Sequence, residues 1–493
     1  MQQLSGLDAT FLNIETATTF GHISGLVIFD PSTGRHAASF DEVKAIIEAR
    51  MHLLPPYRQR LVEVPFGLDQ PYWIEDPDFD IDFHLRHIAL PAPGDDRQLA
   101  AQVSRIVSRP LDRRRPLWEL YIIDGLESGH VAQLTKIHHA CIDGVSGAEL
   151  LANLLDLSPE PRHVDPPETP WRPDPVPTEL EMLGRGLLSL ATKPVKGFQL
   201  MTETARNVGA IARAVETEVP VAGRLAARVR GDELLSQAAT RPPRSPFNGL
   251  IGPHRTFGFT TIELAAVKKI KDSFGVTIND VVMTLCATSA RDYLMRRSAL
   301  PDEPLIAMVP VSVRGEDEQG TLGNQVATMT CSLHTHVDDP IQRLDMIHES
   351  MSVAKDTHRA LPASLLQDFA QFSPPAVAAR AARAIARASA RGWGDLPYNL
   401  VVSNVPGPQF PLYGAGAQMV ANYPVSAIHD GVGLNMTVQS YDGRLDFGLV
   451  GCRDLVDDIW ELVDGLQSAT KRYGKLAKKA RKAAKKPSAR GES

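Results

Sequence analysis

Long apolar runs are missing from this sequence. No uninterrupted hydrophobic stretch among its 493 residues approaches the ~18 residues that a membrane-spanning helix needs. The first residues, MQQLSGLDATFLNIE, lack the basic region of a signal peptide and carry acidic residues early. We therefore expect a protein that stays in the cytoplasm unless it adheres to a surface.

Cysteine is also scarce, and the spacing of the few cysteines fits no known cysteine site. The four cysteines are Cys141, Cys286, Cys331 and Cys452, and no two of them form a Cys-x-x-Cys pair. This spacing argues against a disulfide framework, a zinc ribbon and a redox dithiol, and it suits a reducing compartment.

The overall composition is that of an ordinary globular protein. Hydrophobic residues make up 43% of the chain and charged residues 22%, which excludes wholesale disorder, a coiled coil and a collagen-like repeat. Because a single domain holds ~100–200 residues, a chain of this length should form two or more packed units.

The net charge of −6 hides a strong asymmetry. Residues 471–486 contain nine Lys or Arg and no acidic residue, whereas residues 1–470 contain 42 basic and 57 acidic side chains. An acidic body does not fit a nucleic-acid enzyme, so no nucleic acid is expected as a partner. The basic tail needs an explanation of its own.

Two proline-rich breaks divide the chain. Residues 158–178 contain eight prolines and should form an extended strap over a surface, and RPPRSP follows at 241–246. Between the breaks, leucine, valine and isoleucine recur at helical spacing but are interrupted by glycine and proline. The predicted units are an N-terminal domain (1–157), a proline-rich and helical linker (158–246), a C-terminal domain (247–470) and a basic tail (471–493).

Both predicted domains mix strands with helices. Branched residues and partial alternation predict strands at 22–30, 131–138, 305–313, 399–403 and 434–440. Helical patterns occupy 148–157, 263–274 and 281–295. The coarse prediction is therefore two α/β units joined by a long linker.

The segment KIHHACIDGVSG, residues 136–147, is the strongest candidate for chemistry. Successive strand residues point to opposite faces, so His138 and His139 do not both face one site easily, which weakens a zinc interpretation. One imidazole can instead face a channel, where a neutral histidine is suited to deprotonate an alcohol. A core histidine pair before an ordinary Asp143-Gly144 turn explains the same residues equally well.

The segment HHACIDG resembles the HHxxxDG motif of acyltransferases with the chloramphenicol acetyltransferase fold. The rest of the chain is similar to one family, the bacterial wax ester synthase/acyl-CoA:diacylglycerol acyltransferases. The stretches that carry the resemblance occur in the family's order over roughly residues 3–460: LSGLDATFLNIE (4–15), PLWEL (116–120), HHACIDG (138–144), PFNGLIGPHR (246–255), the Asn279-Asp280 pair, VPVSVR (309–314) and LVVSNVPGP (400–408).

This resemblance implies a fold and an activity. It implies two chloramphenicol-acetyltransferase-like domains, each a mixed sheet with helices, around a central tunnel. It implies direct transfer of a fatty acyl group from acyl-CoA to diacylglycerol, with wax ester formation from a long-chain alcohol as a second activity. His139 would be the general base, with no acyl-enzyme, no metal and no cofactor. Cys141 is then a small buried hydrophobe and not a nucleophile.

The resemblance also assigns roles to other residues. His138 would be a packed partner of the base, and Asp143 would be structural, paired with an arginine of the second domain for which Arg314 is the candidate. Gly144 would let the backbone turn tightly beside the channel. Asn279 would contact the substrate or the oxyanion, although a plain helix N-cap explains its position equally well.

Two other functions remain open from the sequence. An acyltransferase of the same fold could use another hydroxyl lipid or a carrier-bound acyl donor. A non-catalytic protein that coats lipid droplets is the second alternative, but a binder needs no base in its channel.

The linker and the tail carry two further hypotheses. The linker helices at 180–235 should cover the domain junction and the tunnel, unless they are a passive spacer. The tail should adsorb to anionic lipid, with a weak apolar stripe giving shallow insertion. A solvated tail or one that binds nucleic acid is the alternative. On this basis the protein should lie on the inner membrane face or on lipid droplets.

Overall fold

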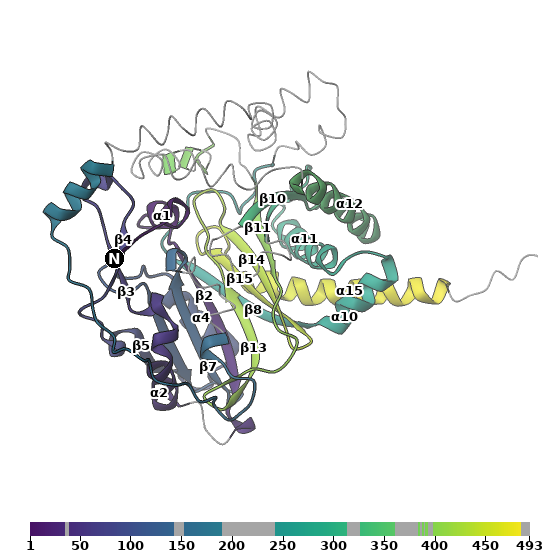
Figure 1. Cartoon of the computed structure of the whole chain (residues 1–493). Coiled ribbons are helices and arrows are strands. Elements are labelled where there is room, and N and C mark those ends of the chain that lie inside the picture. The colour runs from purple at the N-terminus through teal and green to yellow at the C-terminus, as the bar shows by residue number, and fades with distance from the viewer. Residues whose placement is uncertain are drawn as a thin grey trace, which may run out of the picture.

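The chain folds into a mixed α/β protein with two six-stranded sheets (Figure 1). The structure is a computed structural model, and it describes residues 1–34, 39–141, 152–189, 242–312, 326–359, 383–384, 387–388, 390–392 and 398–484. None of the helices in these ranges combines the length and the apolar character needed to cross a membrane.

The first sheet has the strand order β12-β13-β2-β7-β6-β5. Its strands are β2 (His22–Asp30), β5 (Leu85–Ala89), β6 (Trp118–Asp124), β7 (Val131–His138), β12 (Tyr413–Gly414) and β13 (Ala417–Val425). All neighbours are antiparallel except β5 and β6, which are parallel.

Short elements surround this sheet. The helices are α1 (Gly6–Asn13), α2 (Phe40–Arg50), α3 (Ile81–His84) and α4 (Asp96–Val107). A small sheet joins β1 (Gln2–Gln3), β4 (Tyr72–Glu75) and β3 (Gln59–Val62). The 3-10 helices are η1 (Pro31–Thr33), η2 (Met51–Leu53), η3 (Pro55–Tyr57), η4 (Pro65–Gly67) and η5 (His139–Cys141). Ser39 and Asp95 start α2 and α4 with complete capping boxes, which satisfy the first backbone N–H groups of each helix.

The second sheet has the strand order β10-β9-β11-β14-β15-β8. Its strands are β8 (Arg255–Glu263), β9 (Ile306–Ser312), β10 (Val326–Ser332), β11 (Leu400–Val405), β14 (Leu434–Tyr441) and β15 (Arg444–Cys452). The helices α10 (Leu264–Phe274), α11 (Ile278–Arg296), α12 (Pro340–Arg359) and α15 (Ile459–Ala484) gather beside it (Figure 1). The central helix α11 is buried along most of its length.

The two sheets are interlocked, because β12 and β13 come from the C-terminal part of the chain but complete the first sheet. On β15, the absence of a side chain at Gly448 lets β13 approach, since a Cβ there would lie 1.8 Å from the Pro424 carbonyl oxygen. Asp446, fully buried on β15, accepts a hydrogen bond of 2.8 Å from the Asn422 N–H of β13. The predicted C-terminal unit therefore supplies strands to both sheets.

Most of the predicted elements are present. Strands occur at 22–30, 131–138, 306–312, 400–405 and 434–441, and helices at 264–274 and 278–296, as the patterns predict. Of the helix predicted at 148–157, residues 152–157 are described; residues 152–154 are helical, and 155–157 are not. The proline-rich segment 158–178 is extended and irregular, and Asp174 binds the Glu75 N–H of β4 at 3.1 Å. The strap prediction is thus confirmed.

The predicted start of a separate tail at residue 471 differs from the structure. Helix α15 passes this point without a break and continues to Ala484. Tyr473 and Ala477 are buried against the second domain, because the helix keeps an apolar face well beyond Thr470. The linker is described up to residue 189, where 179–189 are helical, and from residue 242 onward; its remainder, 190–241, lies outside the described residues.

Candidate active site

The histidine pair lies where β7 ends and η5 begins. His138 is the last residue of β7, and its N–H donates to the Leu117 carbonyl at 2.9 Å. His139 opens η5, and its N–H donates to the Gly21 carbonyl at 2.9 Å. These bonds to different segments fix the backbone at the two histidines.

The His138 side chain is locked inside the protein. It is 1% exposed, and its Nδ1 accepts a hydrogen bond of 3.1 Å from the Ala140 N–H. Its Nε2 lies 3.3 Å from Glu15 Oε1, and because Nδ1 accepts, Nε2 is the nitrogen whose N–H faces this carboxylate. A Cβ at Gly21 would come within 2.5 Å of this Nε2, which explains the glycine there. His138 is therefore the packed partner of the pair.

Glu15 is the anionic centre of this network. Its Oε1 accepts the Gly21 N–H at 2.7 Å, and its Oε2 accepts Arg113 Nη2 at 2.7 Å. Burial raises the pKa of Glu15, but the contacts with His138, Gly21 and Arg113 outweigh it and lower the pKa to about 2. The carboxylate is thus ionised at neutral pH, and it ties the segment before β2 to the histidine turn.

His139 is more accessible than its neighbour. Its side chain is half-buried, and its ring stacks on Phe11 of α1 with centroids 4.1 Å apart and planes 9° apart. Stacking restrains the face of the imidazole, and of the two ring nitrogens Nδ1 is buried. One ring of the pair is thus packed and the other partly accessible, although His139 lies in η5 and not in the strand.

Cys141, two residues beyond His139, has the environment of a core residue. It is buried, and burial together with the nearby Asp8 carboxylate raises the pKa of its thiol. A nucleophilic cysteine needs the opposite shift, because the thiolate is the reactive form. Trp118 of the PLWEL stretch also braces the core, since it stacks on Tyr57 at 4.2 Å and donates to the Tyr57 carbonyl at 2.8 Å.

Asn279 does not cap its helix. The N-cap of α11 is Thr277, which exchanges hydrogen bonds with Asp280 in a complete capping box, so the N-cap explanation of Asn279 is wrong. Asn279 Oδ1 instead accepts a hydrogen bond of 3.3 Å from Asn404 Nδ2 on β11. The Asn-Asp pair and the LVVSNVPGP stretch therefore lie together. No described contact joins Asn279 to His138 or His139.

Three predicted site residues cannot be placed. Asp143, Gly144 and Arg314 lie outside the described residues, so their roles stay predictions. Within the described ranges, no group of three or more His, Cys, Asp or Glu side chains is arranged to hold a metal ion.

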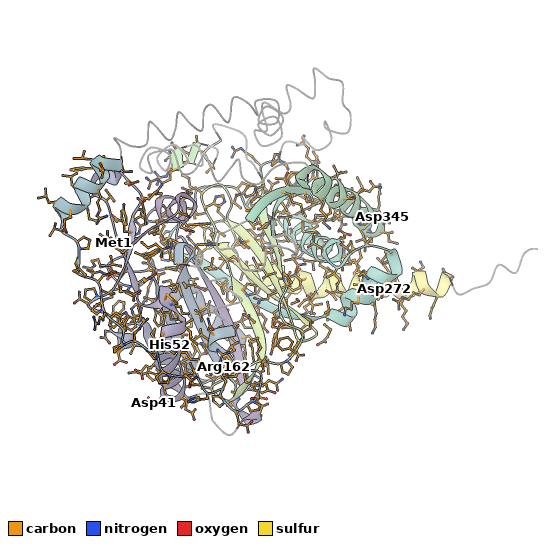
Figure 2. The ribbon with its side chains drawn as sticks, viewed as in Figure 1. Met1, Asp41, His52, Arg162, Asp272 and Asp345 are labelled. Carbon is orange, nitrogen blue, oxygen red and sulfur yellow. The ribbon has the colours of Figure 1, made fainter. Side chains whose placement is uncertain are left out.

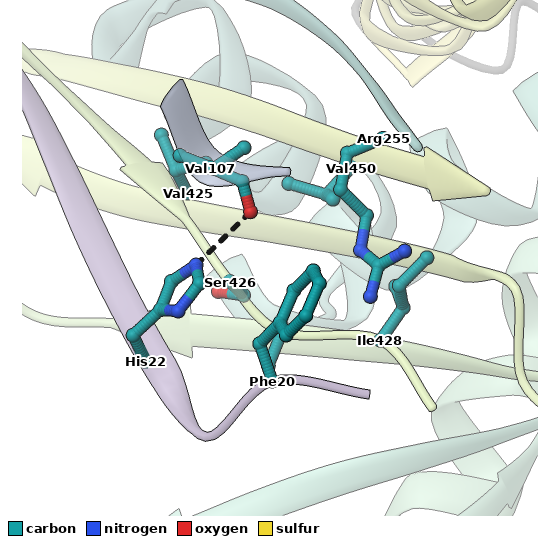
Figure 3. A pocket seen from close by; sticks show the side chains of 9 residues that line it. Phe20, His22, Val107, Arg255, Val425, Ser426, Ile428 and Val450 are labelled. Carbon is teal, nitrogen blue, oxygen red and sulfur yellow. Dashed lines mark hydrogen bonds between the residues drawn. The ribbon is translucent and has the colours of Figure 1, made fainter. Parts of the chain in front are cut away.

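A small cavity lies at the junction of the two sheets, between His22 of β2 and Arg255 of β8 (Figure 3). Its volume of about 10 Å³ leaves room for one water molecule at most. The His22 ring donates from Nε2 to the Val107 carbonyl at 3.0 Å, and burial with the charge of Lys136 lowers its pKa to about 3. This cavity does not accommodate an acyl chain, and the expected tunnel stays a prediction.

Sequence reasoning missed the residues that hold the histidine pair. Phe11 and Glu15 belong to the LSGLDATFLNIE stretch, but nothing in their spacing indicates a contact with residues 138–139. Gly21 looks like an ordinary residue before a strand. The sequence indicated that the stretch LSGLDATFLNIE resembles the family, but this resemblance assigned no role to Phe11 or Glu15.

Comparison with known proteins identifies relatives along nearly the whole chain. The sequence profile of the wax ester synthase/diacylglycerol acyltransferase catalytic domain matches residues 4–282. That of the WS/DGAT C-terminal domain matches residues 322–473. A Mycobacterium tuberculosis protein named as a diacylglycerol O-acyltransferase is 37% identical over 96% of this chain and 90% of its own length. A Mycobacterium bovis protein with the same description is 36% identical over 94% of this chain and 97% of its own.

Solved structures agree with the sequence relatives. The wax ester synthase/diacylglycerol acyltransferase from Marinobacter aquaeolei superposes with a TM-score of 0.67 at 29% identity, over 97% of this chain and 100% of that one. The starter condensation domain of rhizomide synthetase shares the fold with a TM-score of 0.51 at 13% identity, over 97% of this chain and 95% of that one. The fold and these matches together show that this chain belongs to the wax ester synthase/diacylglycerol acyltransferase family.

Proposed function

We propose that this protein is an O-acyltransferase that moves a fatty acyl group from acyl-CoA to diacylglycerol and so forms triacylglycerol. Long-chain alcohols are a second class of acceptor and give wax esters. The observation that carries the proposal is the arrangement of the motif in a chain of this family. His138 is buried and hydrogen-bonded. The adjacent His139 is half-buried, and its ring stacks on Phe11.

In the proposed step, His139 acts first as a base and then as an acid. A nitrogen of its ring takes the proton from the acceptor hydroxyl, and the oxygen attacks the carbonyl carbon of the thioester. The new C–O bond forms, the C–S bond breaks, and the protonated ring gives its proton to the departing CoA sulfur. No acyl-enzyme is needed, in keeping with a Cys141 whose thiol pKa is raised.

The other motif residues are assigned supporting roles. Asp143 orients the loop after η5 through an ion pair with Arg314, and Gly144 permits the tight turn beside the substrate. Asn279 donates a hydrogen bond to the substrate or to the oxyanion. This role is supported by its carbonyl oxygen being engaged by Asn404, which leaves its amide N–H₂ group as the donor. An oxyanion donor of this kind contributes ~3–4 kcal/mol.

The proposed reaction uses neither a metal nor a cofactor, because the thioester already supplies an activated acyl group. Acyl-CoA and the alcohol are the partners. Since diacylglycerol lies in membranes, we place the protein in the cytoplasm, bound peripherally to the inner membrane face or to lipid droplets. The acidic body of the chain gives no reason to expect a nucleic acid as partner.

Replacement of His139 tests the mechanism. With palmitoyl-CoA and dioleoylglycerol as substrates, His139→Ala should release free CoA thiol ~10²–10⁴-fold more slowly, the usual contribution of a general acid–base. Its thermal unfolding should stay close to that of the wild type, because the side chain is half-buried and lies at the start of η5.

His138→Ala is the matched control. It removes a buried ring that contacts Glu15, so it should lower the melting temperature clearly. Near-normal thiol release by His139→Ala would contradict the mechanism. A wild-type protein that is inactive with palmitoyl-CoA but acylates the alcohol when the acyl group is supplied on a carrier protein would favour a carrier-bound donor.

A further inference from the structure

The charges of the predicted tail that lie within the described residues, from Lys471 to Lys482, are carried by a packed helix. From Lys471 to Ala484 the chain continues α15, and this outer half of the helix extends past α10 and away from the sheets (Figure 1). Tyr473 and Ala477 are buried, and Leu476 packs against the core of the second domain. Of the apolar residues that the sequence offers for insertion into lipid, Leu476 and Ala480 are therefore half-buried, and Ala483 is exposed.

The opposite side of the outer half is basic and exposed. Lys471, Lys475, Lys478 and Lys482 follow one another at steps of three and four residues, which puts them on one face of the helix. Lys479 lies beside them and is also exposed. None of these five lysines forms an ion pair with a described acidic residue, and Figure 2 shows side chains of this segment reaching into open space.

Helix α10 adds to this basic surface. Arg481 of α15 donates to Ser273 Oγ at 2.7 Å and to the Lys269 carbonyl at 3.1 Å, so the two helices lie side by side. This contact brings the exposed Lys268 and Lys269 next to the lysines of α15. The adjacent Asp272 is already engaged with Lys271 at 3.2 Å. The result is a rigid cationic surface on a molecule whose remaining chain is acidic.

We propose that the exposed lysines of α10 and of the outer half of α15 form a docking surface for the anionic headgroups of a phospholipid bilayer. The proposal deepens the membrane location given above and depends on it. Charge complementarity selects the partner, since about 1 kcal/mol of attraction is available for each Lys near an anionic surface. Binding is electrostatic and without insertion, because the apolar face of α15 is occupied by the protein core.

A lipid surface fits these residues better than a nucleic acid does. The acceptor alcohol of the proposed reaction lies in the bilayer, so a docked enzyme reaches its substrate. Proteins that hold single strands add exposed aromatic rings for base stacking, and the aromatic residue of this segment, Tyr473, is buried. Competition with duplex DNA nevertheless belongs in the test.

The experiment is co-sedimentation of the full chain with phosphatidylcholine vesicles, with and without phosphatidylglycerol as a third of the lipid. The test variant replaces Lys475, Lys478, Lys479 and Lys482 by glutamine, which keeps helix propensity and removes no buried contact. Truncation at Thr470 is unsuitable because it deletes the buried Tyr473 and Ala477. The matched control replaces four exposed arginines elsewhere by glutamine: Arg105, Arg109, Arg172 and Arg453.

The wild type and the control should bind the anionic vesicles, and the lysine variant should bind on the order of 1,000-fold more weakly, because it lacks four of the lysines. Wild-type binding should fall steeply as salt shortens the Debye length from ~10 Å at 0.1 M to ~3 Å at 1 M. Equal binding by the lysine variant, equal loss in the control, or tighter wild-type binding to duplex DNA would each overturn the proposal.

Turnover separates this inference from the proposed function. With detergent-dispersed dioleoylglycerol, the lysine variant should release thiol at the wild-type rate, because no residue of the surface belongs to the site. Absence of turnover in the wild type would contradict the proposed function and leave the vesicle result standing.

Discussion

Single residues decide how the histidine pair is presented. Glu15 contacts His138, Gly21 and Arg113 through one carboxylate, and Gly21 in turn accepts the N–H of His139. The position of the proposed base thus depends on a residue of another segment. Glu15 acts through these neighbours and is a positioning residue.

Replacing this carboxylate by an amide should weaken both stability and turnover. Glu15→Gln keeps an acceptor for the Gly21 N–H but loses the charge that binds Arg113 and His138. We expect a loss of about 1.5–3 kcal/mol in the free energy of unfolding, as for hydrogen bonds to charged groups. We also expect kcat to fall roughly tenfold, because a misplaced base raises the activation free energy by about 1.4 kcal/mol.

The pH dependence of the stability lost in Glu15→Gln shows whether the charge of the carboxylate is the cause. The pKa of Glu15 is lowered from 4.5 to about 2 in the folded protein. Its stabilisation is therefore complete above pH 4.5 and disappears as the pH falls toward 2. The free energies of unfolding of the wild type and of Glu15→Gln, measured in urea, should therefore approach each other as the pH falls from 4.5 toward 2. Glu63→Gln is the control, since Glu63 also contacts Arg113 but is 64% exposed and should matter little.

At the scale of elements, local sequence patterns indicate where strands and helices lie, whereas long-range contacts decide how the strands cross. The strands β2 and β7 coincide with the predicted segments, which are rich in branched residues and alternate only in part between buried and half-buried positions. The start of α11 is set by the Thr277 and Asp280 capping box, two residues away from the asparagine that the motif emphasises. No local sequence pattern predicts that β13 crosses β15. The crossing depends on a glycine at 448, which leaves space for β13, and on the buried carboxylate of Asp446.

The buried Asp446 predicts a pH-dependent stability at this crossing. Burial raises its pKa from 3.8 to about 6, against the opposing hydrogen bonds from Thr261 and from the Asn422 N–H. A carboxyl group with a raised pKa favours the folded state at low pH, and this contribution is lost as the pH rises from about 4 through 6. A shift of two pKa units corresponds to about 3 kcal/mol.

Asp446→Asn tests this contribution, because an amide stays neutral throughout. The free energy of unfolding of the wild type, relative to the variant, should fall by roughly 2–3 kcal/mol between pH 4 and pH 7 in urea titrations. A difference that is the same at every pH would show that the carboxyl group titrates alike in the folded and unfolded chain.

At the scale of the whole molecule, the halves depend on each other. The first sheet is completed by β12 and β13, and β2 pairs with β13 from Asp30 to Ser24. One core cluster joins residues of both halves, including Leu26, Phe257 and Val450. The division into an N-terminal and a C-terminal unit therefore describes the order of the chain better than its folding units.

A fragment experiment follows from this interlocking. Residues 1–246 expressed alone should be aggregated or unfolded, because β2 becomes an open edge with apolar residues beside it. Coexpression with residues 247–493 should restore a soluble complex that elutes as one species in gel filtration. A monomeric, folded 1–246 fragment would contradict the dependence on β13.

The sequence by itself determined the composition class, the α/β character, most of the helices and strands, and the family through its ordered motifs. It also predicted, from the alternation of side chains along a strand, that the two consecutive histidines would not both face one site easily. These properties depend on neighbours in the chain, which a sequence displays directly.

The tertiary structure decided which of the two histidines is enclosed. Glu15, Gly21 and Ala140 hold His138 in the interior, while Phe11 orients the more accessible His139. It decided as well that the basic segment after Thr470 continues a packed helix, since Tyr473 and Ala477 find apolar partners in the second domain. Such outcomes depend on contacts between distant segments, whose free energies of burial and pairing exist only once the chain has folded.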